Sequence, residues 1–266
     1  MIVYISGANG FIGSTIFKLL KEKYSVKIIE RDSILPKLSA DDVLVLAHAA
    51  VASGRKDVGM QELFEANVLY TNKLIQHFKH SKVIYLSTAS IYCNSKVINN
   101  NSEINPKNSY SISKYWGELV VQTECQEYYI LRLSSVYGEG MKEGTLIPNY
   151  VTQFLSKNSI EVWGKGERTQ NFIHVHDVVR LIELLIDLQI NRKGLYLCVD
   201  NKEYSNFEMA MFVTENNRDR ITFIGIDTTP SLFYDNSKTK NIFGWEPKTT
   251  LENGVKRYIE WKKKQS

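Results

Sequence analysis

The sequence predicts a doubly wound parallel α/β sheet followed by a smaller α+β lobe. Two observations lead to this prediction. The chain opens with an apolar run, a glycine-rich turn and an amphipathic helical pattern. Apolar runs of strand length then alternate with segments of helical periodicity, which is the pattern of a parallel sheet covered by helices on both faces.

Size and composition set the outer limits. The 266 residues suffice for one large domain or two small ones. The net charge of +4 is mild, and the lysine cluster Lys262–Lys264 ends the last expected helix, where cations complement the helix dipole. We therefore expect no nucleic-acid partner. The cysteines Cys93, Cys125 and Cys198 lack paired or metal-like spacing, and the apolar run Val43–Ala52 is too short to cross a bilayer. These features predict a cytoplasmic protein without a membrane partner.

The first element is a strand over Ile2–Ser6, followed by the turn Gly7–Gly13 and a helix. This order brings backbone N–H groups and the positive end of a helix to a pyrophosphate. Gly7 permits the tight turn, Gly10 lets phosphates approach the backbone, and Gly13 lets the helix pack on the strand. The spacing therefore indicates a dinucleotide-binding turn, with a purely structural turn as the alternative.

The second strand, Val26–Ile29, ends at Glu30 and Arg31. An acidic side chain about 20 residues beyond the glycines accepts hydrogen bonds from a ribose diol. Glu30 favours NAD because a carboxylate repels a 2′-phosphate. Arg31 keeps NADP open, since a guanidinium binds the same phosphate. A strand-end charge pair without a binding role is the remaining alternative.

The central strands follow in order. Val43–His48 is apolar, as a parallel strand buried on both faces should be, and it runs into the small turn Ala49–Ala50. A helix is expected over Glu62–Phe78, and then a strand over Lys82–Leu86. This strand carries Ser87–Tyr92 at its carboxyl end, where open α/β sheets bind ligands.

A polar loop then leads to a helix with Tyr110 and Lys114, and a further strand is expected over Tyr128–Ser134. Residues four apart share one helix face. A free phenol ionises at about pH 10, and an ammonium one turn away should lower the pKa of Tyr110 toward neutrality. Tyr110 could then exchange a proton with a substrate oxygen. A buried aromatic ring and a snorkelling amine on an amphipathic helix are the structural alternative.

Together these segments resemble an extended short-chain dehydrogenase/reductase, of the NAD-dependent nucleotide-sugar epimerase/dehydratase family, over almost the whole chain. Gly7–Gly13 matches the family's cofactor turn, Ser87–Tyr92 matches the segment with the catalytic hydroxyl, and Tyr110–Lys114 supplies the rest of a triad. Further matches follow in the family's order over Leu131–Gly138, Gly164–Val178 and Asp235–Trp261.

The resemblance implies a Rossmann domain formed by residues 1–136 plus 167–200, and a substrate-binding lobe formed by residues 137–166 plus 201–266. It implies Thr88, Tyr110 and Lys114 as the catalytic residues. The expected cofactor-binding residues are Gly7, Asn9, Gly10, Phe11, Ile12, Gly13, Glu30, Arg31, His48, Ala49, Ala50, Asn67 and Lys114. The expected substrate-binding residues are Thr88, Ser90, Ser135, Arg168 and Gln170.

The chain also departs from the family pattern. Only a dozen residues, 31–42, stand where the family usually has another strand and helix, so we expect a sheet reduced at one edge and a more open adenine pocket. Cys93 replaces a usual glycine, and Ser135 replaces an asparagine. Gln170 stands where an arginine often binds the substrate diphosphate. Arg168 is either its substitute or an exposed arginine.

The resemblance implies hydride transfer at C4 of a nucleotide-activated sugar by an NAD(P)-dependent epimerase or 4-ketoreductase, with Tyr110 as acid and base. A 4,6-dehydratase also needs an acid after the catalytic hydroxyl, and Ala89 and Ser90 cannot serve, so dehydration is disfavoured. A non-catalytic dinucleotide-binding sensor or scaffold on the same fold is the alternative. Such a protein would have no need of Tyr110.

The remaining expectations concern partners and other site types. A nucleotide sugar is the expected substrate, and the resemblance implies a possible homodimer through the Tyr110 helix. We expect no metal, because His48, His174 and His176 lack a surrounding ligand cluster. Trp163 and Trp245 are expected to pack in the core or at a hinge rather than to offer stacking surfaces.

Overall fold

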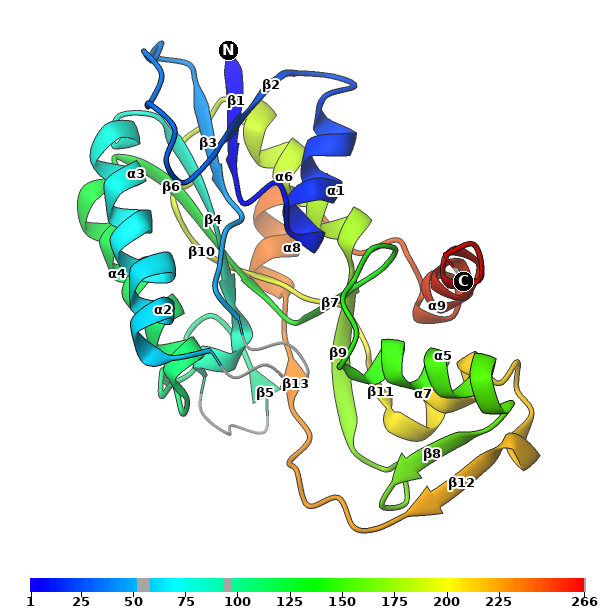
Figure 1. The fold of residues 1–266 in the computed structure, drawn as a ribbon. Helices are drawn as coiled ribbons and strands as arrows, with labels where there is room; N and C mark the ends of the chain where they lie inside the picture. The colour runs from blue at the N-terminus through cyan, green and yellow to red at the C-terminus, as the bar shows by residue number, and fades with distance from the viewer. Residues whose placement is uncertain (52–57, 93–96, 266) are drawn as a thin grey trace.

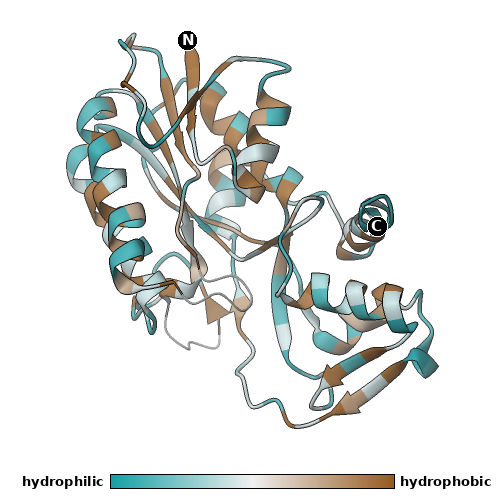
Figure 2. Cartoon of the chain, in the orientation of Figure 1, coloured by the Kyte–Doolittle hydropathy of each residue, from teal (hydrophilic) through white to brown (hydrophobic). Residues whose placement is uncertain are grey.

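A computed structural model describes residues 1–51, 58–92 and 97–265, so Cys93 lies outside the described residues. Figure 1 shows a layered α/β part and, beside it, a smaller lobe of short strands and helices. Figure 2 shows apolar residues along the strands of the layered part and polar residues on the outer surfaces of its helices. The arrangement is that of a sheet buried between two helical layers.

Six parallel strands form the central sheet in the order β10-β6-β4-β3-β1-β2. Their bounds are β1 Ile2–Ser6, β2 Ser25–Ile29, β3 Val43–Leu46, β4 Lys82–Thr88, β6 Glu127–Leu133 and β10 Gly194–Cys198. The direction of winding reverses at β1, which pairs with β2 on one side and β3 on the other. Ligands of open α/β sheets bind outside the strand ends at this point. The predicted doubly wound parallel sheet is confirmed.

Helices cover both faces of the central sheet (Figure 1). One face carries α1 Phe11–Leu20, α6 Val175–Asp187 and α8 Ser237–Phe243, and the other carries α3 Tyr70–Phe78 and α4 Ser109–Glu124. Apolar side chains of β1, β3, β4 and β6 alternate between these faces and pack into a separate core on each side. The strands are thus buried on both faces, as their apolar sequences indicate.

The helix expected over Glu62–Phe78 is interrupted. It consists of α2, Met60–Phe64, a π-helical turn, Glu65–Leu69, and then α3. A π-turn inserts one extra residue into the helical path and is frequent at functional sites. Here it contains Asn67, one of the predicted cofactor-binding residues, whose side chain is fully buried.

The sheet ends at β2, as the short segment 31–42 predicts. These residues form neither a helix nor a strand. Leu35 and Leu38 pack against the core beside α3, and a ring nitrogen of His77 lies 2.7 Å from the carbonyl oxygen of Pro36. Asp42 closes the segment by accepting a hydrogen bond of 2.7 Å from the backbone N–H of Ile2. The prediction of a reduced edge is confirmed.

The smaller lobe has its own apolar core. Its strands are β7 Ser135–Tyr137, β8 Ile160–Trp163, β9 Thr169–His174, β11 Glu203–Ser205 and β12 Ile221–Ile224, and its helices are α5 Leu146–Lys157, α7 Asn206–Val213 and α9 Leu251–Lys263. A short pair, β5 Val97–Ile98 and β13 Phe233–Tyr234, joins distant segments. Single 3-10 turns cover Ala89–Ile91 and Arg218–Arg220.

One part of the expected division into domains does not hold. The expected division places residues 237–245 in the smaller lobe. Helix α8, however, packs on β10, and Phe243 and Trp245 belong to the core of the central sheet. The Phe243 ring lies 4.6 Å from the Tyr196 ring of β10. The segment belongs with the central sheet because its aromatic rings are buried there, although it follows residues of the smaller lobe in the sequence. A second part also departs from the division, because Thr169–His174, expected in the Rossmann domain, forms β9, which pairs with β7 and β11, and Phe172 packs in the core of the smaller lobe. The remaining boundaries stay a prediction.

Candidate functional site

The glycine turn follows β1 and begins helix α1. Gly7 has a φ of +78°, and a Cβ atom there would lie 2.5 Å from the His48 backbone. A Cβ atom on Gly13 would lie 2.1 Å from the Gly7 carbonyl oxygen, so helix and strand approach too closely for a side chain. On Gly10, however, a Cβ atom would meet only that oxygen, at 3.4 Å. Gly10 therefore faces open space at the N-terminus of α1, where free N–H groups favour an anion.

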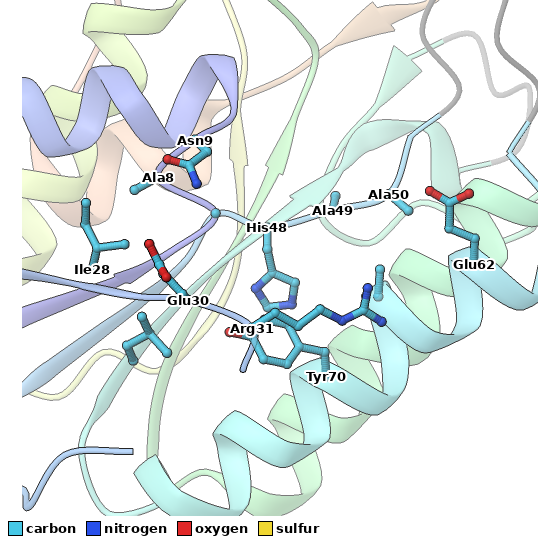
Figure 3. A pocket seen from close by; sticks show the side chains of 13 residues that line it. Ala8, Asn9, Ile28, Glu30, Arg31, His48, Ala49, Ala50, Glu62 and Tyr70 are labelled. Carbon is cyan, nitrogen blue, oxygen red and sulfur yellow. The ribbon is translucent and has the colours of Figure 1, made fainter. Parts of the chain in front are cut away.

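A cavity of about 480 Å³ lies beside this turn and is called the edge cavity. It is lined by Gly7, Ala8, Asn9, Ile28, Ile29, Glu30, Arg31, His48, Ala49, Ala50, Glu62, Ala66 and Tyr70. Figure 3 shows the Glu30 side chain on the side of the turn, whereas the Arg31 side chain extends across Tyr70. The volume falls in the range of about 300–1,000 Å³ that is usual for small-molecule sites.

The charged residues of the edge cavity differ in their partners. The guanidinium of Arg31 lies 3.7 Å from the Glu65 carboxylate. The Glu30 side chain makes no hydrogen bond or ion pair with any residue in the described part of the chain. A carboxylate without a protein partner beside a glycine turn is suited to accept hydrogen bonds from a ligand's hydroxyl groups.

His48 is a half-buried, neutral group in this cavity. Its Nδ1 lies 2.6 Å from Ser6 Oγ and its Nε2 lies 3.1 Å from Thr71 Oγ1. Burial, reinforced by the positive charges of Lys114 and Arg31, lowers the pKa of His48 to about 3. The imidazole is therefore uncharged at neutral pH and shapes the cavity wall without acting as a base.

Asn67 fixes the loop at Ala49–Ala50. Its Oδ1 accepts a hydrogen bond of 2.8 Å from the Ala50 N–H, and its Nδ2 donates to the Ala50 carbonyl oxygen and to Ser113 Oγ. The amide is fully buried and uses both of its ends within the protein. Asn67 thus supports the cavity wall from behind rather than lining the cavity.

A second cavity, of about 320 Å³, continues from the turn to the carboxyl end of β4 and is called the central cavity. It brings together Gly10, Phe11, Ile12, Ala47, Ala49, Val51, Ser87, Thr88, Tyr110, Leu133, Ser134, Val136, Met141, Lys142 and Thr145. Tyr110 reaches it from the first turn of α4. A capping box between Asn108 and Ser111 fixes that turn. Thr88 and Tyr110, predicted from separate motifs, therefore face one space.

The prediction that Lys114 lowers the pKa of Tyr110 is wrong for the protein without a ligand. Burial raises the pKa of Tyr110 to about 12 and lowers the pKa of Lys114 to about 7. The Lys114 amine lies 4.0 Å from the centroid of the Tyr85 ring beneath the helix. Loss of solvation thus dominates both pKa values, because Lys114 is buried and Tyr110 is half-buried at the cavity wall.

A third cavity, of about 270 Å³, adjoins the central one at Thr88 and is called the lobe cavity. It gathers all five predicted substrate-binding residues, Thr88, Ser90, Ser135, Arg168 and Gln170. Sequence reasoning missed the other contributors, which are Ala89, Leu133, Ser134, Thr169, Asn171, Pro230, Leu232 and Tyr234. No motif marks residues 230–234, which reach the cavity because β13 pairs with β5.

A fourth cavity, of about 260 Å³, adjoins the third at Arg168 and is called the outer cavity. Its lining consists of Leu146, Asn149, Tyr150, Trp163, Arg168, Asn206, Ile226 and Asp227. The core alternative for Trp163 is wrong, because this residue is 59% exposed, and the hinge alternative stays a prediction. Trp245, in contrast, is buried as expected. Ala49, Thr88 and Arg168 each line two cavities, so the four cavities follow one another along one path.

Over the described ranges, no group of three or more histidine, cysteine, aspartate or glutamate side chains could hold a metal ion. Nor does any helix within these ranges have the length and apolar character needed to cross a membrane.

Comparison with protein families decides the wider assignment. The model of the NAD dependent epimerase/dehydratase family matches residues 3–196, which is more than half of the chain. The chain belongs to this family. The predicted family is therefore confirmed, and so is the expected cofactor, because the family depends on NAD.

Similar proteins include different activities within the family. A Methanocaldococcus jannaschii protein with the provisional name UDP-glucose 4-epimerase is 27% identical, and the alignment covers 98% of both chains. The human dTDP-D-glucose 4,6-dehydratase is also 27% identical, over 91% of this chain and 76% of its own length. The solved UDP-glucuronic acid 4-epimerase of Bacillus cereus superposes over the whole of both chains with a TM-score of 0.85 at 19% identity, which shows the shared fold.

Proposed function

We propose that this protein is an NAD-dependent enzyme that transfers a hydride at C4 of a nucleotide-activated sugar, as an epimerase or a 4-ketoreductase. The observation that carries the proposal is the central cavity, where Thr88 and Tyr110 face the same space as Gly10–Ile12 of the glycine turn. A proton-transferring hydroxyl must lie beside both the cofactor and the reacting oxygen. The Thr88 side chain also opens into the lobe cavity, where a sugar would bind.

The residues present fit NAD. The N-terminus of α1 would bind the pyrophosphate, and a ribose diol would donate hydrogen bonds to Glu30. The ion pair between Arg31 and Glu65 favours NAD over NADP, because the guanidinium is already engaged by a carboxylate. Lys114 would hold the nicotinamide ribose. Bound NAD supplies the hydride exchange, and the protein supplies binding, orientation and proton transfer.

Tyr110 would donate a proton to the C4 oxygen during reduction and accept one during oxidation. Its raised pKa keeps the phenol protonated at neutral pH in the ligand-free protein, which is the state required for donation. Acceptance requires stabilisation of the phenolate, and the Lys114 ammonium one turn away is the group that can provide it. The Thr88 hydroxyl would orient the same oxygen; it lies 2.9 Å from Ser90 Oγ.

Arg168 would bind the diphosphate of the substrate. It lies at the junction of the lobe and outer cavities, and its Nε is buried without a hydrogen-bond partner. Gln170, at the position of the family's usual arginine, instead donates a hydrogen bond to Asn206 Oδ1 at 2.8 Å. A guanidinium with a free donor suits a phosphate. The exposed ring of Trp163 offers the outer cavity an apolar surface for a nucleobase.

Dehydration remains disfavoured, although several relatives, the human protein among them, are named dehydratases. Eliminating water from a sugar requires a proton donor beside the catalytic hydroxyl. Ala89 is buried and cannot ionise, and the Ser90 hydroxyl is engaged by Thr88.

The experiment compares Tyr110→Phe with wild type on a panel of nucleotide sugars and their 4-keto derivatives. We expect turnover to fall by about 10²–10⁴-fold, the usual range for loss of an acid–base group, with little change in NAD affinity. Tyr115→Phe on the same helix is the matched control and should keep full activity. Unchanged turnover in Tyr110→Phe would remove the catalytic assignment of Tyr110, and absence of turnover in wild type on the whole panel would favour the non-catalytic sensor.

The same assay separates the two reactions. An epimerase inverts C4 without net consumption of cofactor and retains NAD tightly through purification. A 4-ketoreductase consumes NADH in proportion to a 4-keto sugar and exchanges its cofactor freely. Proton NMR of the sugar and absorbance at the reduced-nicotinamide band report these outcomes.

The proposal includes a homodimer through α4. Ile112, Trp116 and Leu119 form an apolar stripe at helical spacing and are 50%, 50% and 42% exposed, respectively. Leu69, also 50% exposed, extends the patch from the neighbouring helix. Analytical ultracentrifugation should show a dimer for wild type and a monomer for Trp116→Lys. A monomeric wild type would contradict this part of the proposal.

A further inference from the structure

The surroundings of the Lys114 amine are unusual for a charged group. The residue is 1% exposed, and its Nζ lies 4.0 Å from the centroid of the Tyr85 ring. An ammonium above an aromatic face is attracted by the ring's quadrupole. The Glu118 carboxylate, one turn further along α4, also favours the charged form of Lys114. These two groups oppose the loss of charge that burial alone would cause.

Tyr85 is held in place by the same helix. Its hydroxyl donates a hydrogen bond of 3.3 Å to the carbonyl oxygen of Lys114. The ring fits below α4 because position 117 is glycine; a Cβ atom on Gly117 would lie 2.2 Å from the Tyr85 hydroxyl oxygen. The backbone of Lys114 thus fixes the ring on which its own ammonium rests.

Glu118 is fixed by an ion pair that is cut off from solvent. Arg132 Nε and Nη2 donate hydrogen bonds of 3.0 and 2.7 Å to the two carboxylate oxygens, and Ser87 Oγ donates one of 2.5 Å. Glu118 and Arg132 are 0% and 1% exposed, respectively. Ser87 directly precedes Thr88 on β4. The ion pair therefore ties the helix that carries Tyr110 and Lys114 to β6, and the Ser87 hydrogen bond ties the same helix to the strand that carries Thr88.

We propose that Tyr85 and Glu118 are positioning residues that hold the Lys114 side chain in its charged form beneath the central cavity. Neither touches the cavity path of substrate or cofactor; both act through the amine. The other titratable groups close to this site are Tyr110 on α4 and His48 after β3, and His48 is uncharged. The inference rests on the proposed catalytic role of Lys114.

The test follows the protonation of Lys114 directly in the full-length protein without cofactor. The ¹³C chemical shift of the lysine Cε is recorded against pH, and the Lys114 signal is assigned through its absence in Lys114→Arg. We compare Tyr85→Leu, which removes the ring, with Tyr85→Phe, which removes only the hydroxyl. Loss of the ring should lower the titration midpoint by about one pH unit. Tyr85→Phe should keep the midpoint within a few tenths of a unit.

Equal midpoints in wild type and Tyr85→Leu would overturn the proposal. If Tyr85→Leu does not fold, Gly117→Ala decides, because its methyl group would lie 2.2 Å from the Tyr85 hydroxyl oxygen and so shifts the ring; it would also lie 2.9 Å from the Asn67 carbonyl oxygen. Its midpoint should fall as well, and an unchanged midpoint would again reject the inference. Because no substrate turns over in this titration, its failure is distinct from failure of the Tyr110→Phe assay.

Discussion

Replacing Arg132 by methionine tests the buried ion pair most directly. The guanidinium makes two hydrogen bonds to Glu118 and one of 2.5 Å to the Tyr92 hydroxyl. In Arg132→Met the Glu118 carboxylate keeps the Ser87 hydroxyl as its hydrogen-bond donor. Breaking a pair that is this deeply buried costs about 3–5 kcal/mol of unfolding free energy. In a chain of this size we expect the melting temperature to fall by about 10 °C.

The loss should depend on pH with a definite sign. Without Arg132, the buried Glu118 carboxylate has lost the opposite charge beside it, so the folded state favours its protonated form. The folded protein then binds a proton more strongly than the unfolded chain, so stability falls as pH rises. The difference in melting temperature between Arg132→Met and wild type should therefore be larger at pH 8 than at pH 5.

Thermal unfolding followed by circular dichroism at both pH values provides the assay. Glu118→Leu combined with Arg132→Met should recover most of the loss, because an apolar pair of similar volume replaces a buried ion pair without penalty. Lys240→Met, which removes an exposed ion pair with Glu246, is the control and should melt close to wild type. A double variant less stable than Arg132→Met would refute the reasoning.

Three further predictions follow. Gly10→Ala should fold normally yet bind NAD at least tenfold more weakly, as measured by calorimetry. Gly13→Ala should instead lose stability, because its methyl group meets the Gly7 carbonyl oxygen. Burial raises the pKa of Asp200 to about 6. The stability linked to its protonated form is therefore lost as pH rises through 6. Asp200→Asn should raise the melting temperature more at pH 8 than at pH 5. Arg168→Gln should raise KM for the nucleotide sugar about tenfold without changing NAD affinity, as measured by initial rates.

The sequence predicted those elements whose structure depends on residues close together in the chain. The apolar runs at Val43–Leu46 and Lys82–Leu86 specify parallel strands, and Gly7, Gly10 and Gly13 specify the turn, because backbone sterics act within a few residues. Thr88 could be placed at the site because the carboxyl ends of parallel strands share one edge of the sheet. Tyr110 lies on helix α4, and the family resemblance rather than the strand pattern predicted its place beside Thr88.

Properties set by distant segments were not predictable in this way. The interaction of Tyr110 with Lys114 was inferred from their spacing, but their pKa values depend on burial, which Tyr85 and the rest of the fold determine. Tyr234 enters the lobe cavity through pairing with a strand more than a hundred residues earlier. Trp163 is exposed because its strand lies at the outside of the lobe, and hydrophobic character alone does not report that position.

The π-turn at Glu65–Leu69 limits which sequence changes this helix can accept. Its extra residue turns Asn67 inward to reach Ala50 while α3 keeps its packing on the sheet. Deleting one residue there would rotate all preceding side chains by about 100° relative to those that follow. Removing the π-turn therefore takes a deletion rather than a substitution, and such a deletion would withdraw the Asn67 amide from the Ala50 backbone.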